Sequence, residues 1–230
     1  MRIVERTRIE EVLQDIDLLP LMEDAFRGYS AGRSIVPPVG ELLLEKGEVH
    51  IKYGAIAGDA YYVIKVASGF YQNPALGLPS SNGMVLVFRQ DTGEPEAVLL
   101  DEGHLTDVRT AAAGAVAARA LAPPVVERIG VLGTGMQARL QVRHLAPLFE
   151  TREVVAWGRD RQRLEAYRSD MAEAGFEVVA AESAAGVAAQ TPHHVTTPPA
   201  TEPLLRAADL RPGTHVNAIG SDTTEKQELE

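Results

Sequence analysis

The chain has 230 residues, of which 45% are hydrophobic, no cysteine, and a formal net charge of −10 at pH 7. The length suits one large or two small domains, no apolar run approaches the roughly 20 residues that span a bilayer, and the missing cysteines exclude disulfides and thiolate metal sites. An acidic chain with a mixed-charge start and no apolar leader predicts a cytoplasmic protein with no nucleic-acid or membrane partner. The six histidines lack metal-ligand spacing, so we expect no metal.

The first 100 residues contain two sequence patterns, one helical and one typical of strands. Residues 9–29 show apolar positions every three or four residues, which predicts an amphipathic helix. Residues 36–100 contain short runs rich in Val, Ile and Tyr, broken by turn residues, and residues 91–94 read as a hairpin turn. We therefore expect an antiparallel sheet after the helix.

An alanine-rich helix is expected from Thr106 to Ala122, where two prolines end it. If Thr106 caps this helix, Arg109 lies in the first turn, where a cation opposes the helix dipole. A bound substrate carboxylate would relieve that conflict. The alternative is an ordinary surface ion pair of Arg109 with one of three nearby carboxylates: Asp101, Glu102 or Asp107.

The most informative stretch is Gly133-Thr134-Gly135-Met136-Gln137-Ala138, which follows the apolar run 128–132. The first glycine permits a tight turn, the second lets backbone approach a phosphate, and the small Ala138 lets a helix pack on its strand. A helix-length segment, 136–149, and a second apolar run, 154–157, complete a βαβ unit. These six residues are predicted to bind a dinucleotide, the alternative being a purely structural turn.

Three further strands are expected at residues 176–180, 193–197 and 214–219. Strands that alternate with helices indicate an α/β domain with a parallel, doubly wound sheet. Such domains usually continue beyond this number of strands, so we expect the nucleotide-binding domain to be truncated at its C-terminus and the chain to be a fragment.

Gly158 and Arg159 follow the second strand, where an NAD site would present an acid to the ribose. A glycine there does not repel a 2′-phosphate, and Arg159 could pair with it, which favours NADP over NAD. Two alternatives stay open: Arg159 is a solvated loop residue, or Asp160 reaches the ribose.

Two further residues could carry chemistry. Lys65 lies in a predicted strand on the same face as Val63 and Ala67, either as a snorkelling edge residue or as a carboxylate partner or proton donor. Asp222 follows a predicted parallel strand, where it could handle a proton on a substrate nitrogen, although Asp222-Thr223-Thr224-Glu225 also reads as a capping box.

Three segments together resemble the ornithine cyclodeaminase/mu-crystallin family: Leu105 to Ala112, Gly130 to Ala138, and His215 to Asp222. The resemblance implies a Rossmann-type doubly wound sheet with an α+β substrate-binding and dimerisation domain. We place the latter at residues 1–122, the NAD(P)-binding domain at 123–230, and expect a homodimer.

The resemblance also implies roles for single residues. Lys65 and Arg109 match the family's carboxylate-binding pair, Asp222 matches its catalytic aspartate, and Thr110 is grouped with the cofactor-binding residues. Residues 157–159 look like the NADP-binding mu-crystallin branch. Where ornithine cyclodeaminases carry a glutamate and a Met-Pro pair, this chain has His50-Ile51-Lys52-Tyr53, so ornithine is not implied, and Lys52 is a candidate substrate-binding cation.

The expected reaction is NAD(P)-dependent hydride transfer at the α-carbon of a small amino or imino acid. Lys65 and Arg109 clamp the carboxylate, and Asp222 manages the proton on nitrogen, with Lys65 as a second catalytic candidate. Three outcomes share this step: amino-acid oxidation, ketimine reduction, or cyclodeamination. The alternative is a non-catalytic NADPH-binding protein or an inactive fragment of such an enzyme.

Overall fold

The computed structural model describes residues 1–221 and 225–230, and these divide into two compact units, residues 1–109 and 110–230. The boundary falls inside α3 (His104–Leu121) instead of after Ala122, where the sequence suggested it. The reason lies in the second part of the helix, which belongs to the second unit: the side-chain amide of Asn217 donates to the carbonyl of Gly114 at 2.9 Å.

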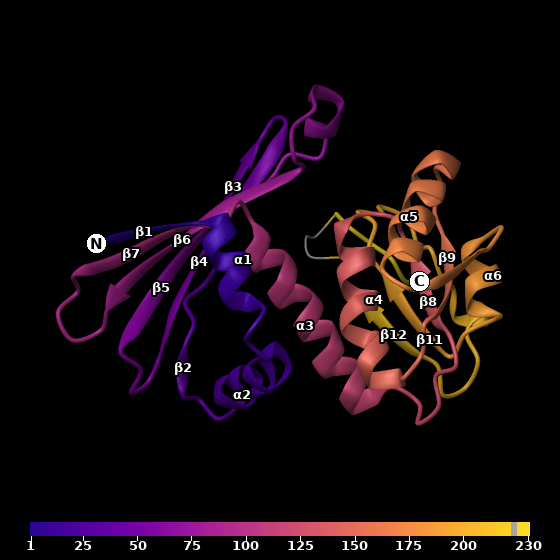
Figure 1. Cartoon of the computed structure of the whole chain (residues 1–230), viewed down its shortest axis with the longest axis horizontal. Helices are drawn as coiled ribbons and strands as arrows, with labels where there is room; N and C mark the ends of the chain where they lie inside the picture. Colours follow the sequence, from indigo (N-terminus) through magenta and orange to yellow (C-terminus); the bar gives the residue numbers. More distant parts are fainter. Residues whose placement is uncertain (222–224) are drawn as a thin grey trace. The chain divides into compact units, whose positions relative to one another are not determined.

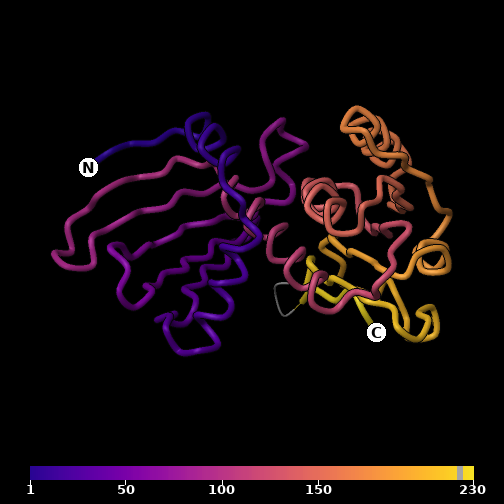
Figure 2. Tube along the Cα trace, turned by 60° about the horizontal axis from the view of Figure 1, so that its bottom comes forward, coloured from indigo at the N-terminus to yellow at the C-terminus, as the bar shows by residue number. Residues whose placement is uncertain are grey.

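A seven-stranded sheet forms unit 1, with strand order β1-β7-β6-β5-β4-β2 and β3 paired to β4. The expected antiparallel sheet is confirmed from β2 to β7, and β1 adds a parallel strand beside β7. Figure 2 shows these strands as long tracks running side by side. The expected turn at 91–94 joins β6 to β7. The strands are β1 (Arg2–Glu5), β2 (Ser34–Ile35), β3 (Gly40–Leu44), β4 (Gly47–Ile56), β5 (Tyr61–Gly69), β6 (Ser81–Arg89) and β7 (Pro95–Leu100).

Two helices, α1 (Arg6–Leu13) and α2 (Leu18–Ser30), replace the single helix expected over residues 9–29. The prediction was wrong because apolar spacing continues across a break. Asp17 accepts a hydrogen bond from the backbone N–H of Leu19 at 3.1 Å and caps a new helix. A 3-10 turn, η1 (Asn73–Leu76), lies between β5 and β6. None of the described helices has the length and apolarity to cross a membrane.

The two faces of the unit 1 sheet differ in burial. Side chains alternate along each strand, so Lys65, Val85 and Ala97 share one face, where Val85 and Ala97 are buried. Figure 1 shows α1 and α2 on one side of this sheet. The opposite face leaves large apolar side chains exposed on five strands: Ile3, Leu42, Ile51, Tyr53, Met84 and Leu100.

Unit 2 contains five parallel strands in the order β10-β9-β8-β11-β12. The chain starts in the middle of the sheet, moves to one edge, and returns to fill the other side, which is the doubly wound order of dinucleotide-binding folds. The expected fold class is confirmed. The strands are β8 (Ile129–Leu132), β9 (Glu153–Trp157), β10 (Glu177–Ala180), β11 (His193–Thr196) and β12 (His215–Ala218).

Helices cover both faces of this parallel sheet. Figure 1 shows α4 (Met136–Phe149) and α6 (Ala184–Ala188) on opposite sides of the strands, as right-handed crossovers require. The helix α5 (Arg161–Glu173) lies beside α4, and η2 (Ala207–Asp209) precedes β12. All four residues of β8 are buried, so the core of unit 2 lies around the strand that leads into the glycine turn.

Candidate active site

In unit 1, Lys65 lies on an interior strand and not at a sheet edge. Its partner across the β4–β5 pair is Lys52, and Val85 of β6 lies on its other side. The Lys65 ammonium donates to the Thr106 hydroxyl of α3 at 3.0 Å. The side chain is half-buried and held by a specific partner, which argues against the snorkelling alternative.

The environment of Lys65 favours loss of its proton. Burial lowers the pKa of Lys65 to about 8, and the nearby positive charges of Arg109 and Lys52 act in the same direction, while Asp101 raises it. Arg109 and Lys52 therefore both lie close enough to Lys65 to interact with it. A bound carboxylate would stabilise all three charges, so the structure brings together the predicted substrate-binding residues of unit 1.

The first turn of α3 is organised by Asp101 and not by Thr106. The Asp101 side chain is buried, and its Oδ2 accepts from the backbone N–H of Leu105 at 2.9 Å. Because the helix already begins at His104, Thr106 is inside it, and the expectation that Thr106 is the cap was wrong. The hydroxyl of Thr106 is instead the partner of Lys65. Arg109 follows one turn later and has an exposed side chain.

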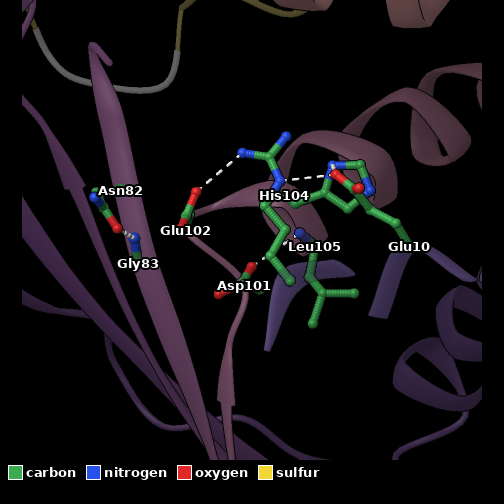
Figure 3. Close-up of polar contacts among 8 residues, drawn as sticks. Glu10, Asn82, Gly83, Asp101, Glu102, His104 and Leu105 are labelled. Carbon is green, nitrogen blue, oxygen red and sulfur yellow. Dashed lines mark hydrogen bonds and ion pairs between the residues drawn. The ribbon is translucent and has the colours of Figure 1, made fainter. Parts of the chain in front are cut away.

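Figure 3 shows the polar contacts around this helix start, with Asp101 beside Leu105 and Glu10 beside His104. Arg6 donates to Glu10 at 2.7 Å and to Glu102 at 3.2 Å, so it bridges α1 to the turn before α3. The Arg6 hydrogen bond lowers the pKa of Glu10. These contacts attach the helix start to the sheet that carries Lys65.

In unit 2, the two glycines of the turn at residues 133–135 differ in the space around them. Gly133 has φ of +119°, and a Cβ at this position would collide with the Thr197 hydroxyl, so only glycine fits. A Cβ on Gly135 would meet no atom within 4 Å. The turn is therefore closed on the side of β11 and open in front of Gly135.

The start of α4 offers backbone donors to that open space. Gly135 is the N-cap and supplies no side-chain hydrogen bond to the first N–H groups of the helix. Ala138 is fully buried and lets α4 pack closely, as expected, whereas Met136 is exposed. Gln137 accepts from Gln141 at 3.4 Å. An anion at this helix start would satisfy the uncapped donors and the helix dipole together.

Gly158 and Arg159 lie at the end of β9, the strand next to β8. A Cβ on Gly158 would lie 2.7 Å from a methyl carbon of Thr134, so a side chain there would press on the glycine turn itself. Asp160 caps α5 by accepting from the N–H groups of Gln162 and Arg163 at 2.8 and 3.1 Å. Arg159 is exposed, with no hydrogen bond or ion pair to the rest of the described chain.

Thr110 and Asp222 are the two other predicted site residues. The carbonyl of Thr110 accepts from Gln141 at 3.2 Å, which ties the beginning of unit 2 to α4. Asp222 lies outside the described residues. The two residues before it, Gly220 and Ser221, donate their N–H groups to one oxygen of Glu228 at 2.8 and 3.0 Å.

Glu228 is a buried carboxyl that the sequence analysis missed. Its burial raises its pKa, although the groups that donate to it act in the opposite direction. Its backbone carbonyl also accepts from the N–H groups of Leu204 and Leu205, so both the side chain and the backbone of Glu228 are held by hydrogen bonds. In the sequence, Glu228 is one of three glutamates in residues 225–230, nine residues after a predicted strand, and spacing alone cannot identify it as the buried one.

The comparisons with known proteins agree with this geometry. The family model described as "Ornithine cyclodeaminase/mu-crystallin family" matches residues 1–230. The chain is 38% identical over 235 residues to an uncharacterized cyclodeaminase of Sinorhizobium fredii, a match that covers all of this chain and 71% of the relative.

Two solved structures are similar over the whole chain. One is an archaeal alanine dehydrogenase dimer with bound NAD, with a TM-score of 0.89, 30% identity and 70% of its chain covered. The other is the Δ1-pyrroline-2-carboxylate reductase of Thermococcus litoralis in complex with NADH and L-proline, with a TM-score of 0.93, 25% identity and 72% of its chain covered. The three proteins are named for a cyclodeaminase, a dehydrogenase and a reductase, the same three outcomes left open above.

Proposed function

Because this chain belongs to the ornithine cyclodeaminase/mu-crystallin family, whose members are NAD(P)-dependent oxidoreductases and cyclodeaminases acting on small amino or imino acids, we propose separate roles for the residues of its two units. Unit 1 holds the substrate carboxylate with Lys65, Arg109 and Lys52, and unit 2 holds the dinucleotide at residues 133–138. The interaction of Lys65 with Arg109 and Lys52 carries this proposal.

The residues of unit 1 bind and orient the substrate. Lys65 keeps one ammonium proton on Thr106 and has further protons for a carboxylate, while the Arg109 guanidinium can donate two parallel hydrogen bonds. A carboxylate held by two cations is fixed in direction, which places the α-carbon and converts binding energy into orientation. With a pKa of about 8, Lys65 can also release a proton near neutral pH, which supports its second proposed role as a proton donor.

The dinucleotide supplies or accepts the hydride at the substrate α-carbon. Oxidation of an amine at that carbon needs the neutral amine lone pair, and reduction of an imine needs a proton on nitrogen. We assign the transfer of this proton to Asp222, which follows Ser221 in the sequence and matches the catalytic aspartate of the family. The proposed phosphate-binding residues are Gly133, Thr134, Gly135, Met136, Gln137 and Ala138. Thr110 is a further proposed cofactor-binding residue.

We further propose that the preferred dinucleotide is NADP. The two solved relatives above contain NAD and NADH, so the preference must come from residues of this chain. Gly158 leaves no acid to repel a 2′-phosphate, and Asp160 uses its carboxylate as the α5 cap. Arg159 is exposed beside them and can pair with the extra phosphate.

A homodimer formed through unit 1 is part of the proposal. The archaeal relative is described as a dimer, and the exposed apolar face of the unit 1 sheet resembles a surface that another protein covers. A second copy of this chain is the proposed partner. The absence of cysteine is consistent with a cytoplasmic location, where disulfides are rare.

The test combines turnover with binding. We expect anaerobic mixing with NADPH and a set of cyclic imino acids, or with NADP and small amino acids, to change the nicotinamide absorbance. In the Asp222→Asn variant, turnover should fall by roughly 100-fold or more while the dissociation constant for NADPH stays unchanged. An NADPH-binding protein that turns over no substrate in either direction would contradict the proposal. An Asp222→Asn variant as active as the parent would contradict the role of Asp222.

A further inference from the structure

Arg139, in the first turn of α4, is a half-buried cation beside the glycine turn. Its NH1 group donates to the carbonyl oxygens of Thr134 and Gly135, the latter at 3.1 Å. Its Nε donates to Asp170 of α5 at 2.9 Å, and its NH2 contacts the same carboxylate. Only 18% of the side chain is exposed.

Those two carbonyls determine where two N–H groups point. In a trans peptide the C=O and N–H bonds lie in the same plane and point in opposite directions, and no described peptide bond is cis. The carbonyls of Thr134 and Gly135 share their planes with the N–H groups of Gly135 and Met136. Because Arg139 draws both carbonyls toward itself, both N–H groups are directed away from it.

The space beside Gly135 is open. Gly135 has no heavy atom within 4 Å of an added Cβ, and no side chain of the N-cap occupies the first donors of α4. Two adjacent N–H groups that point outward from a turn make a concave site for an anion. Arg139 therefore holds the turn in a conformation in which the N–H groups of Gly135 and Met136 point toward the space that a phosphate would occupy.

The guanidinium is itself held in place. Its central carbon lies 5.2 Å from the ring centroid of Tyr167, which is fully buried in α5, and Asp170 neutralises its charge from the same helix. A cation near a helix start is otherwise unfavourable, since it opposes the dipole. This cost is offset by the contacts with Asp170, Tyr167 and the two carbonyls, which together fix its plane.

We propose that Arg139 is a positioning residue for the dinucleotide pyrophosphate, acting through the peptide groups of residues 134–136. The inference rests on the proposed function, because it takes the pyrophosphate to bind at this turn. The proposed role of Arg139 does not depend on attraction between its charge and the pyrophosphate. A planar guanidinium can bridge two carbonyls and a carboxylate at once, whereas a lysine ammonium on a flexible stem cannot hold the same plane.

The experiment compares Arg139→Met and Arg139→Lys with Arg143→Met, which removes the same charge from an exposed position one turn along the same helix. Dissociation constants are measured for NADPH, NADH, ADP and adenosine, with thermal unfolding of each variant alongside. We expect Arg139→Met to weaken NADPH, NADH and ADP by about tenfold, the loss of one to two well-oriented hydrogen bonds, and to leave adenosine unchanged. Arg139→Lys should recover only a small part of the lost affinity for these three ligands, and the affinities of Arg143→Met should equal those of the parent protein.

The measured affinities distinguish failure of the proposed function from failure of the proposed role of Arg139. If the parent protein binds neither NADPH nor NADH, the proposed function fails and this inference fails with it. If the parent binds and Arg139→Lys binds ADP as tightly as the parent does, charge alone is at work and only the inference is overturned. Should Arg139→Met not fold, Asp170→Asn decides in its place, with an expected weakening of ADP by about threefold and none of adenosine.

Discussion

Under the proposed function, the two units bind their anions by different physical means. Unit 1 uses the charged ends of long side chains, with Lys52, Lys65 and Arg109 gathered on one face of an antiparallel sheet and at the first turns of a helix. Unit 2 uses backbone N–H groups, presented by a glycine turn at the end of a buried parallel strand. Affinity at the unit 1 site should therefore depend on pH and on charged residues, while affinity at the unit 2 site should depend on the shape of the backbone turn.

The largest effect is expected from removing the central cation of unit 1. In Lys65→Met, kcat/KM should fall by about 100-fold or more, because a charge-assisted contact to the carboxylate is lost and Thr106 loses its donor. The dissociation constant for the dinucleotide should not change. Steady-state kinetics and a fluorescence titration check the two statements, with Lys46→Met, at an exposed turn, as the matched control. Equal losses in catalysis and in dinucleotide binding would argue against separate tasks for the two units.

The glycines of unit 2 should respond in two contrasting ways. Gly133→Ala should lower the free energy of unfolding by about 2–4 kcal/mol, because its φ is positive and the new methyl group collides with Thr197. Gly135→Ala has room for a methyl group, so its melting temperature should stay close to that of the parent. Its affinity for the dinucleotide should nevertheless fall by about tenfold, since the methyl group occupies the phosphate space. Thermal unfolding and titration distinguish the pair, and a shared loss of stability would contradict the open side of the turn.

The pH dependence of carboxylate binding should come from unit 1. The pKa of Lys65 is lowered to about 8, and a carboxylate binds the protonated form better. Affinity for a substrate carboxylate should thus be constant below pH 8 and fall as pH rises above it, by up to about tenfold per pH unit. The measurement is KM, or the inhibition constant of an unreactive carboxylate, from pH 6.5 to 9.5. A profile that is flat across pH 8 would be incompatible with Lys65 as the binding cation.

The smallest expected effect concerns Lys52, which is exposed and lies across the strand pair from Lys65. Its charge lowers the pKa of Lys65, so Lys52→Gln should move the break in the affinity profile to higher pH. The same titration checks this shift. A move toward lower pH would mean that Lys52 stabilises the protonated form of Lys65 through some other contact.

Much of unit 2 was predictable because its signals are local. The bounds of α4 agree with those expected from apolar spacing, and β8 was marked by an apolar run directly before two glycines. Each of these features depends on residues that are neighbours in the sequence. The parallel, doubly wound character of the sheet then followed from the alternation of strands and helices along the chain.

The parts that were wrong or missed depend on partners that are distant in the sequence. Spacing suggested one helix over residues 9–29, but Asp17 caps a second helix within it. Thr106 was read as a cap because the buried carboxylate of Asp101 could not be recognised from its neighbours. Arg139 and Glu228 were missed for the same reason, since each acts on backbone groups whose proximity only the fold establishes.

The pairing of Lys52 with Lys65 has a consequence for how this protein is handled. Like charges directly opposite one another in a sheet are mutually destabilising, and burial adds to the cost at Lys65. An empty site of this kind attracts any small carboxylate in the solvent, so acetate, formate or citrate in a buffer would act as weak competitors and as stabilisers of unit 1. Enzyme assays run in such buffers would underestimate the affinity for the true substrate, and cationic buffers without carboxylates are the better choice.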